Sequence, residues 1–287
     1  MPEMVAFCGR HFEVVARADK VCDTVTKYQN LSRRVADSVL LKAVRCDGGF
    51  HDGCQADCLM YWKEAWLRRA DGSAGPSRAA SPADCEALMA RVAPHVTRVR
   101  DDGERVYRCQ ATEAIAASSP LSTADPRPYI RECTSGNVRL GTFVTVMGRA
   151  ISAHARNKLG RLPNPPLRGT EAKSPTTPLL DLEPGEWVRV KAPHEIEATL
   201  NDKGTNKGLW FDREMEALCG QVFQVRQRVN RFINETDGTM IELKSDCVTL
   251  DGAVCSGEYS LSRWFCPRAI HPYWREGWLE RVDAPAS

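Results

Sequence analysis

Alternating apolar and polar positions near both ends of the chain predict β-strands. Residues 12–16 and 223–227 alternate with a period of two, which is typical of a strand with one buried face. The runs ADSVLLKAV (36–44) and DCVTLDG (246–252) are short, β-branched and bounded by turn residues. The segment INETDGTMIELK (233–244) predicts a hairpin, because its Asp-Gly pair suits the positive φ of a tight turn.

The middle of the chain has the spacing of helices instead. Ser81, Pro82 and Asp84 form a capping signal that starts a predicted helix over 81–99. A second helical stretch, PRPYIREC, breaks at a Ser-Gly pair, and a long helix is predicted over 137–160. Five apolar residues of this long helix repeat at helical spacing and are expected to face a core. They are Leu140, Phe143, Val144, Met147 and Ile151.

The β-type ends of the chain resemble each other. EMVAFCGRHFEVVARAD (3–19) matches EMEALCGQVFQVRQRVN (214–230), and CQADCLMYWKEAWLRR (54–69) matches CPRAIHPYWREGWLER (266–281). Between these blocks, the motif around Asp37, Val39 and Cys46 matches the one around Asp246, Val248 and Cys255. Because order and approximate spacing persist over three blocks, we interpret the ends as two copies of one module.

The second copy begins with an additional segment, GEWVRVKAPHEIEATLNDKGTNKGLWFDREM (185–215), which reads as a strand, a short helix and another strand. This succession resembles small SH3-like barrels, over about 187–283 and less completely over 2–70. The resemblance implies an α+β fold with two related small β-barrel (SH3-like) modules joined by an α-rich insert. The expected divisions are an N-terminal module (1–70), the insert (71–160), a proline-rich linker (161–186) and a C-terminal module (187–287).

Composition and charge narrow the function classes. The chain is 43% apolar and 26% charged, as in ordinary globular proteins. Its 39 basic and 37 acidic residues give a net charge of +2, which argues against nucleic acid as a partner. It has no apolar run of membrane-spanning length and no signal-like start, so we expect no membrane partner and a cytoplasmic location.

A cytoplasmic location changes how the 12 cysteines are interpreted, because a reducing compartment favours metal ligation over disulfides. Cys46, His51, Cys54 and Cys58 fall within 13 residues, interrupted by glycines that allow a tight loop. Thiolates and an imidazole together suit tetrahedral zinc. The leading prediction is therefore a zinc site on these four residues.

Two alternatives to this zinc site remain open. If His51 is not a ligand, Cys109 would complete an all-thiolate site with the three loop cysteines, which suits a [4Fe–4S] cluster. The comparison of the copies favours a site in the first, because His51 and Cys58 align with Arg263 and Ile270. The other alternative is a second metal site with rearranged spacing. Its ligands would be Cys247, Cys255, Cys266 and His271.

Candidate catalytic residues come from two places. Glu64 lies between two tryptophans and could be desolvated, although its recurrence as Glu276 favours a role in the fold, such as pairing with an arginine. The insert is dense in polar side chains that could line a pocket. The candidates there are Gln110, Glu113, Arg127 and Tyr129.

Three function hypotheses follow. The first is a metal-dependent enzyme that acts on a small molecule held by the polar insert. The second is a non-catalytic scaffold or interaction protein with structural zinc, and a further alternative is an iron–sulfur protein with an all-cysteine site. The sequence does not determine the reaction, the substrate or the oligomeric state.

Overall fold

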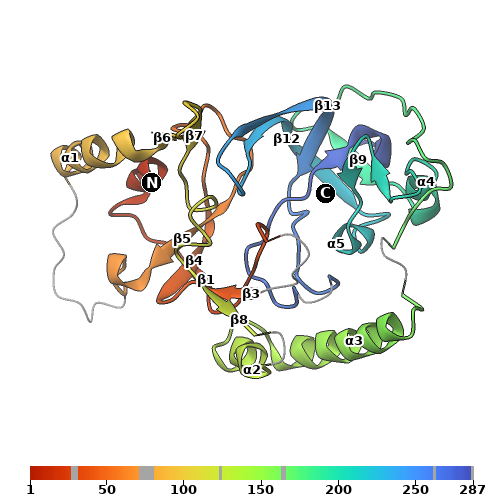
Figure 1. The fold of residues 1–287 in the computed structure, drawn as a ribbon, viewed down its shortest axis with the longest axis horizontal. Helices are drawn as coiled ribbons and strands as arrows, with labels where there is room; N and C mark the ends of the chain where they lie inside the picture. Colours follow the sequence, from red (N-terminus) through yellow and green to blue (C-terminus); the bar gives the residue numbers. More distant parts are fainter. Residues whose placement is uncertain (27–31, 71–80, 123–124, 163–165, 261–262, 286–287) are drawn as a thin grey trace. The chain divides into compact units, whose positions relative to one another are not determined.

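The computed structural model describes residues 1–26, 32–70, 81–122, 125–162, 166–260 and 263–285, and combines helices with small sheets. The chain forms two units (Figure 1). The first unit comprises Met1–Leu140, Arg231–Glu242 and Phe265–Arg268. The second comprises Gly141–Asn230, Leu243–Trp264 and Ala269–Ser287. The boundaries of these units differ from the domain boundaries predicted at residues 70, 160 and 186, which stay predictions.

The first unit is organised around three antiparallel strands in the order β1-β4-β5. These are β1 (Val14–Arg17), β4 (Ser38–Arg45) and β5 (Leu59–Lys63). Met60 and Trp62 alternate with less buried residues on β5, and they pack with β4 against Met4 of the 3-10 helix η1 (Pro2–Phe7). A single apolar face thus gives this sheet its core, while the loop that joins β4 to β5 is left to form the site.

Shorter elements complete the first unit. A second sheet has the order β2-β3-β8, and β6 pairs with β7. The strands are β2 (Val21–Cys22), β3 (Ser32–Arg34), β6 (Thr97–Val99), β7 (Arg105–Tyr107) and β8 (Ser119–Leu121). The helices are η2 (Glu64–Trp66), α1 (Pro82–Val92), η3 (Ala93–His95) and α2 (Arg127–Thr134).

The second unit contains most of a five-stranded sheet with the order β14-β13-β12-β9-β15. Its strands are β9 (Trp187–Val190), β12 (Val222–Ile233), β13 (Met240–Leu250), β14 (Trp274–Arg275) and β15 (Leu279–Arg281). The remaining elements are α3 (Leu140–Lys158), α4 (Pro193–Glu197), β10 (Thr205–Asn206), β11 (Leu209–Trp210), α5 (Arg213–Glu216) and η4 (Glu276–Trp278). Its core includes Phe211, Trp274 and Trp278, with the Phe211 ring edge-on to both indoles.

Corresponding residues of the two proposed copies occupy corresponding positions in their sheets. Val39 is paired with Trp62 between β4 and β5, and Val248 is paired with Trp274 between β13 and β14. The strand order β1-β4-β5 likewise parallels β12-β13-β14. The internal repeat proposed from the sequence stays a prediction.

The two small barrels expected from the sequence are not closed. Among the described residues the strands form open sheets, with β1 and β5 at opposite edges of one and β14 and β15 at opposite edges of the other. A barrel requires its edge strands to pair with each other, and these do not. The fold is mixed α+β, and membership of the SH3-like class stays a prediction.

The predicted helices are present, with two corrections. Ser81 caps α1 as expected, accepting a 3.2 Å hydrogen bond from the Asp84 N–H, but the helix ends at Val92 rather than near Val99. The chain continues as the short helix η3, which contains Pro94, a residue without an N–H to donate.

The second correction concerns α3, which spans Leu140–Lys158 but does not bury its predicted face. Leu140, Val144 and Ile151 are all more than 60% exposed, whereas Val146 and Ala150 are buried. The periodicity located the helix correctly and its buried face incorrectly.

No helix among the described residues is long and apolar enough to cross a membrane.

Candidate metal centre

The loop from Cys46 to Cys58 leaves β4 and returns as β5. Its ends are held together by the Cys46 N–H, which donates a 2.9 Å hydrogen bond to the Cys58 carbonyl. Inside the loop, the N–H groups of His51 and Gly53 both donate to the Gly48 carbonyl, at 2.9 and 3.1 Å. Gly48 has a φ of +70°, and a Cβ there would collide with the Cys54 carbonyl. A glycine is therefore required at this position.

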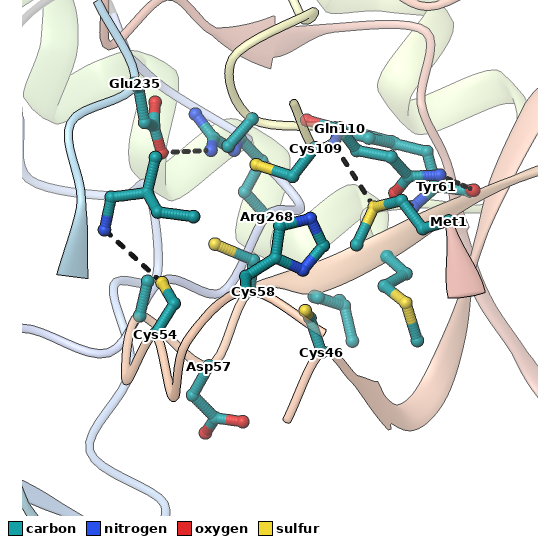
Figure 2. Close-up of a pocket in the computed structure, with 16 residues that line it drawn as sticks. Met1, Cys46, Cys54, Asp57, Cys58, Tyr61, Cys109, Gln110, Glu235 and Arg268 are labelled. Atoms are coloured by element: carbon teal, nitrogen blue, oxygen red, sulfur yellow. Dashed lines mark hydrogen bonds and ion pairs between the residues drawn. The ribbon is translucent and has the colours of Figure 1, made fainter. Parts of the chain in front are cut away.

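Four cysteines line one pocket in the first unit (Figure 2). The cavity has a volume of about 40 Å³. Cys46, Cys54 and Cys58 come from the loop, and Cys109 follows β7 in a distant part of the sequence. All four are free thiols. The structure thus places together the three loop cysteines and the additional ligand that the sequence suggested.

Cys109 is held next to β5 by its neighbour Gln110. The Gln110 side chain accepts a 2.8 Å hydrogen bond from the Tyr61 N–H and donates a 2.7 Å bond to the Tyr61 carbonyl. The Cys109 N–H also donates to the Thr112 hydroxyl at 3.0 Å. Because both ends of the Gln110 amide are used in this way, its evident role is to position Cys109.

The segment Arg231–Glu242, which belongs to the first unit, holds Cys54. The Gln55 N–H donates to the Arg231 carbonyl at 3.0 Å, and the Arg231 N–H donates to the Gln55 side chain at 3.0 Å. Two positions further along the chain, the Ile233 N–H donates to the Cys54 sulfur at 3.4 Å. At the tip of the same hairpin, Gly238 has a φ of +81° and accepts from the Tyr107 N–H at 2.8 Å. The hairpin turn predicted at Asp237-Gly238 is confirmed.

The thiol groups influence one another electrostatically. Burial raises the pKa of Cys46, and the carboxylate of Glu3 and the thiols of Cys58 and Cys109 raise it further. Burial likewise raises the pKa of Cys58 to about 12 and that of Cys109 above its usual range, with neighbouring cysteines contributing in each case. Without a bound cation, these groups are stable as neutral thiols.

Backbone N–H groups point at three of the four sulfurs. Besides the bond from Ile233 to Cys54, Gly48 donates to Cys46, and both Ala111 and Thr112 donate to Cys109. Each of these hydrogen bonds favours the thiolate, although burial outweighs them in the pKa values of Cys46 and Cys109. Such donors stabilise sulfur ligands once a metal has displaced their protons.

A buried guanidinium also lines the pocket. Arg268 is only 7% exposed and lowers the pKa of Cys58. It donates to the Thr24 hydroxyl at 2.8 Å and to Glu235 at 3.0 Å, and Thr24 also contacts Glu235. The guanidinium is thus held in an ion pair with Glu235, whose carboxylate in turn raises the pKa of Cys58.

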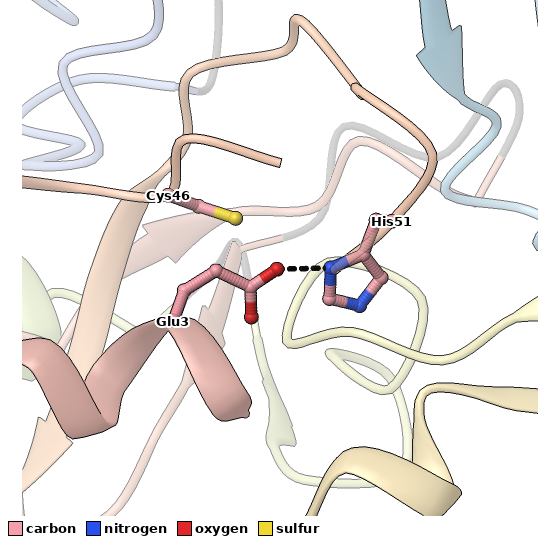
Figure 3. Close-up of side chains that lie close together, drawn as sticks. All are labelled: Glu3, Cys46 and His51. Atoms are coloured by element: carbon pink, nitrogen blue, oxygen red, sulfur yellow. Dashed lines mark hydrogen bonds and ion pairs between the residues drawn. The ribbon is translucent and has the colours of Figure 1, made fainter. Parts of the chain in front are cut away.

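His51 lies at the same pocket but uses both ring nitrogens for hydrogen bonds. Nδ1 is bonded to the Glu3 carboxylate (Figure 3). Nε2 lies 3.1 Å from the Arg108 carbonyl. Burial alone would lower the pKa of His51, but these bonds and the charge of Glu3 outweigh it and raise the pKa. Burial would raise the pKa of Glu3, and its bond to His51 and its backbone hydrogen bonds lower it instead.

The distances between ligand atoms separate two possible metal sites. Among the described residues, the only group of three or more His, Cys, Asp or Glu side chains whose ligand atoms lie within 4.8 Å of one another is Glu3, Cys46 and His51. In Figure 3 the Cys46 sulfur points toward the Glu3 carboxylate. The four cysteine sulfurs share a pocket without forming a group this tight.

The other predicted catalytic residues lie outside this pocket. Arg127 is exposed and binds Asp125 at 2.9 Å, Glu113 binds Arg108 at 3.3 Å, and the half-buried Tyr129 ring lies 4.9 Å from the Lys20 amine. A second pocket of the first unit is lined by Gln110 and Glu113 of the insert, together with Arg108.

Glu64 is also placed differently from the expectation. β5 ends at Lys63, so Glu64 and Trp66 belong to η2 rather than to a strand face, and Trp66 is exposed. Glu64 binds Arg17. In the second copy Glu276 lies 3.9 Å from Arg228, the residue that matches Arg17, and also accepts backbone hydrogen bonds. The expected role in the fold, pairing with an arginine, is confirmed.

The alternative metal site in the second copy does not gather in the structure. Among the described residues, Cys247, Cys255 and His271 of the second unit form no group of ligand atoms within 4.8 Å of one another. The Arg275 guanidinium donates to the Cys247 sulfur at 3.1 Å.

Sequence reasoning missed Glu3 and Arg268. One signal for Glu3 existed, because its counterpart Glu214 begins the matching block of the second copy. Glu3 accepts from the Phe50 N–H at 3.3 Å, and Glu214 accepts from the N–H groups of Tyr259 and Ser260. Both glutamates thus hold a following loop. Arg268 had no such signal, since its partners Glu235 and Thr24 are distant in sequence.

Comparison of the chain with protein-family models, with curated proteins and with solved structures found no match. The chemistry of the pocket is therefore the basis for a functional proposal.

Proposed function

We propose that the first unit is an iron–sulfur module that holds a [4Fe–4S] cluster on Cys46, Cys54, Cys58 and Cys109. The observation that carries this proposal is the meeting of four free thiols at one pocket, three from the β4–β5 loop and one from beyond β7. Four cysteine thiolates are the usual ligand set of such a cluster.

The spacing of the sulfurs does not match a single zinc ion held by three or four of these cysteines. A tetrahedral zinc site with Zn–S bonds of 2.3 Å places its sulfurs only about 3.8 Å apart. Among the described residues, no three of the four cysteine sulfurs lie within 4.8 Å of one another. In a cluster each thiolate binds a different iron, so the sulfurs are more widely separated. His51, the remaining zinc ligand of the sequence prediction, has hydrogen-bond partners at both nitrogens.

The electrostatics of the pocket suit the same ligand. Binding must remove the thiol protons, which the raised pKa values of Cys46, Cys58 and Cys109 oppose. Iron supplies the positive charge that makes thiolates stable, and the backbone donors and Arg268 stabilise the resulting negative charge. Burial and hydrogen bonds to the sulfurs are also the factors by which a protein sets a cluster's reduction potential.

The ligand count indicates the role of the cluster. With four cysteines, each iron would bind one thiolate, so no iron would be left with an open position for a substrate. Of the insert residues predicted to hold a small molecule, Gln110 alone lines the pocket of the four cysteines, and its amide is hydrogen-bonded to Tyr61. We infer that the cluster transfers electrons and does not act as a Lewis acid. The second copy has Ile270 where the first has Cys58, so the cluster belongs to the first copy alone.

The second candidate function is a zinc protein with a site at Glu3, Cys46 and His51. Two observations favour it: the three ligand atoms lie within 4.8 Å, and Glu3 Oε2 is buried without a hydrogen-bond partner among the described residues. Three protein ligands would leave a position for water, as in catalytic zinc sites. The bond between His51 and Glu3 would have to give way for zinc to bind the ring at Nδ1.

The absorbance spectrum of anaerobically purified or reconstituted protein tests the proposal. A cluster gives broad absorption near about 400 nm, which bleaches on reduction by dithionite, whereas zinc gives none. A colourless protein that takes up zinc, and takes up no iron when supplied with ferrous iron and sulfide, would establish the second candidate instead.

A further inference from the structure

Cys22 and Cys266 lie side by side in the interior of the first unit, although 244 positions separate them in the sequence. The Cys22 N–H donates a 3.1 Å hydrogen bond to the Cys266 sulfur, and the two thiols are also hydrogen-bonded to each other. Their residues are only 6% and 5% exposed. Neither lines the pocket of the four cysteines, so the proposed cluster leaves this pair unused.

The surroundings of the pair stabilise negative charge on sulfur. Besides the Cys22 N–H, the backbone N–H of Arg268 donates to the Cys266 sulfur. The fully buried amine of Lys20 interacts with both thiols and with Glu132. The hydrogen bond with Cys22 and burial nevertheless raise the pKa of Cys266, so a proton must leave as the sulfur reacts. Hydrogen bonds and a nearby cation assist that departure.

The pair adjoins the wall of the pocket. Tyr61 and Arg268 line the pocket, and both interact electrostatically with Cys22 and Cys266. Arg268 follows Cys266 by two positions. The segment that carries them is bounded by two strained residues, Phe265 and Ala269, with φ angles of +63° and +43°.

We propose that Cys22 and Cys266 are a second redox centre, a dithiol that closes reversibly to a disulfide. The oxidant is a small disulfide of the glutathione type. One protein thiolate attacks its S–S bond, forming a mixed disulfide and releasing one small thiolate. The second protein thiolate then displaces the other, so the protein loses two electrons and two protons and two small thiols are formed.

The disulfide would act on the pocket through Arg268. It would tie the segment Phe265–Arg268 to β2 and hold the Arg268 guanidinium beside Cys58. In this respect the inference rests on the proposed function, because slower loss of a cluster is the expected consequence. Formation of the disulfide itself does not depend on any metal.

The test equilibrates the full-length protein with mixtures of oxidised and reduced glutathione. Free thiols are then alkylated, and the digested protein is analysed by mass spectrometry. We expect a peptide pair joined through Cys22 and Cys266 that disappears on reduction. Alkylation of both residues at every ratio, or glutathione adducts without the linked pair, would overturn the proposal. Cys133→Ser, a change in α2 of the same unit, should leave the linked pair unaffected.

The cluster proposal is separated from this one by the variant Cys58→Ser. We expect the Cys22–Cys266 pair to form in this variant even though it holds no cluster. Failure of the disulfide in both proteins would refute the dithiol alone, whereas a colourless wild type with an intact disulfide would refute the cluster alone. Iron release to a chelator should be several-fold slower in oxidised wild-type protein, and equal rates would contradict the role given to Arg268.

Discussion

The Cys46 N–H donates a 2.9 Å hydrogen bond to the Cys58 carbonyl and thereby closes the loop that carries three of the four pocket thiols. The matching residues of the second copy make the same bond, from Cys255 to Ile270 at 2.8 Å. The same backbone hydrogen bond thus joins two cysteines in the first copy, and a cysteine and an isoleucine in the second. The difference between the copies lies in side-chain chemistry rather than in how the loop closes.

Replacement of Cys58 should remove the metal centre. Cys58→Ser deletes one of four thiolates, and even changes outside the ligand shell cost 10–100-fold in metal affinity. We expect iron content to fall by at least about tenfold, measured by elemental analysis after anaerobic purification. Cys8→Ser, at an exposed cysteine away from the pocket, is the matched control and should keep its iron. Equal iron in both variants would mean that Cys58 is not a ligand.

Two glycines of the loop provide a matched pair. Gly48 and Gly53 both have positive φ, but a Cβ at Gly48 would collide with the Cys54 carbonyl, whereas a Cβ at Gly53 meets nothing within 4 Å. Gly53→Ala should cost only about 1–2 kcal/mol of backbone strain and retain the cluster. Gly48→Ala should prevent the loop from closing and lose absorbance near about 400 nm. Retention of the full spectrum by Gly48→Ala would show that loop closure does not shape the site.

Replacement of His51 distinguishes the iron–sulfur proposal from both zinc sites that include this residue. His51→Gln leaves the buried Glu3 carboxylate without its partner, which should lower the free energy of unfolding by about 3–5 kcal/mol. The double variant Glu3→Gln/His51→Gln should recover part of this loss in urea unfolding. Iron and sulfide per folded chain should stay unchanged in both. Loss of the metal from well-folded His51→Gln, but not from the exposed control His11→Gln, would make His51 a ligand.

Glu132 predicts a pH dependence of stability away from the metal. Burial raises its pKa to about 7 from 4.5, against the opposing effects of Asn137, Lys20 and Arg131, while Asp19 adds to the rise. Between these values the folded protein binds a proton that the unfolded chain does not. The free energy of unfolding should therefore fall as pH rises from about 4.5 through 7.

The neutral variant Glu132→Gln should escape this loss. Its stability relative to wild type should increase by about 2–3 kcal/mol between pH 5 and pH 8, measured by urea unfolding at each pH. The exposed control Glu86→Gln should differ from wild type by less than about 0.5 kcal/mol throughout. A constant difference for Glu132→Gln would contradict a raised pKa.

Local signals in the sequence located many elements and part of the site. The cap at Ser81, the turn at Gly238 and the strand at 187–190 follow from residue types and short-range periodicity. The three loop cysteines lie within 13 residues, so a tight loop was sufficient to bring them together. Cys109 could be proposed as a further ligand because it falls in a predicted strand of the middle segment.

Features that depend on long-range contacts could not be predicted from local signals in the sequence. The exposed face of α3 shows that apolar periodicity does not by itself identify which side meets a core. The ring nitrogens of His51 are hydrogen-bonded to the Glu3 carboxylate and the Arg108 carbonyl, which are 48 and 57 positions away in the sequence. These partners place His51 in an ion pair, although its position in the sequence suggested a metal ligand. Likewise, nothing local in the sequence joins Cys22 to Cys266 or Arg268 to Glu235.

The most direct test of the central claim is the content of iron, acid-labile sulfide and zinc per chain in anaerobically purified wild-type protein. The account predicts about four iron and about four sulfide per chain with little zinc, and loss of both iron and sulfide when Cys109, the ligand outside the loop, is changed to serine. About one zinc per chain without sulfide, unaffected by Cys109→Ser, would contradict it.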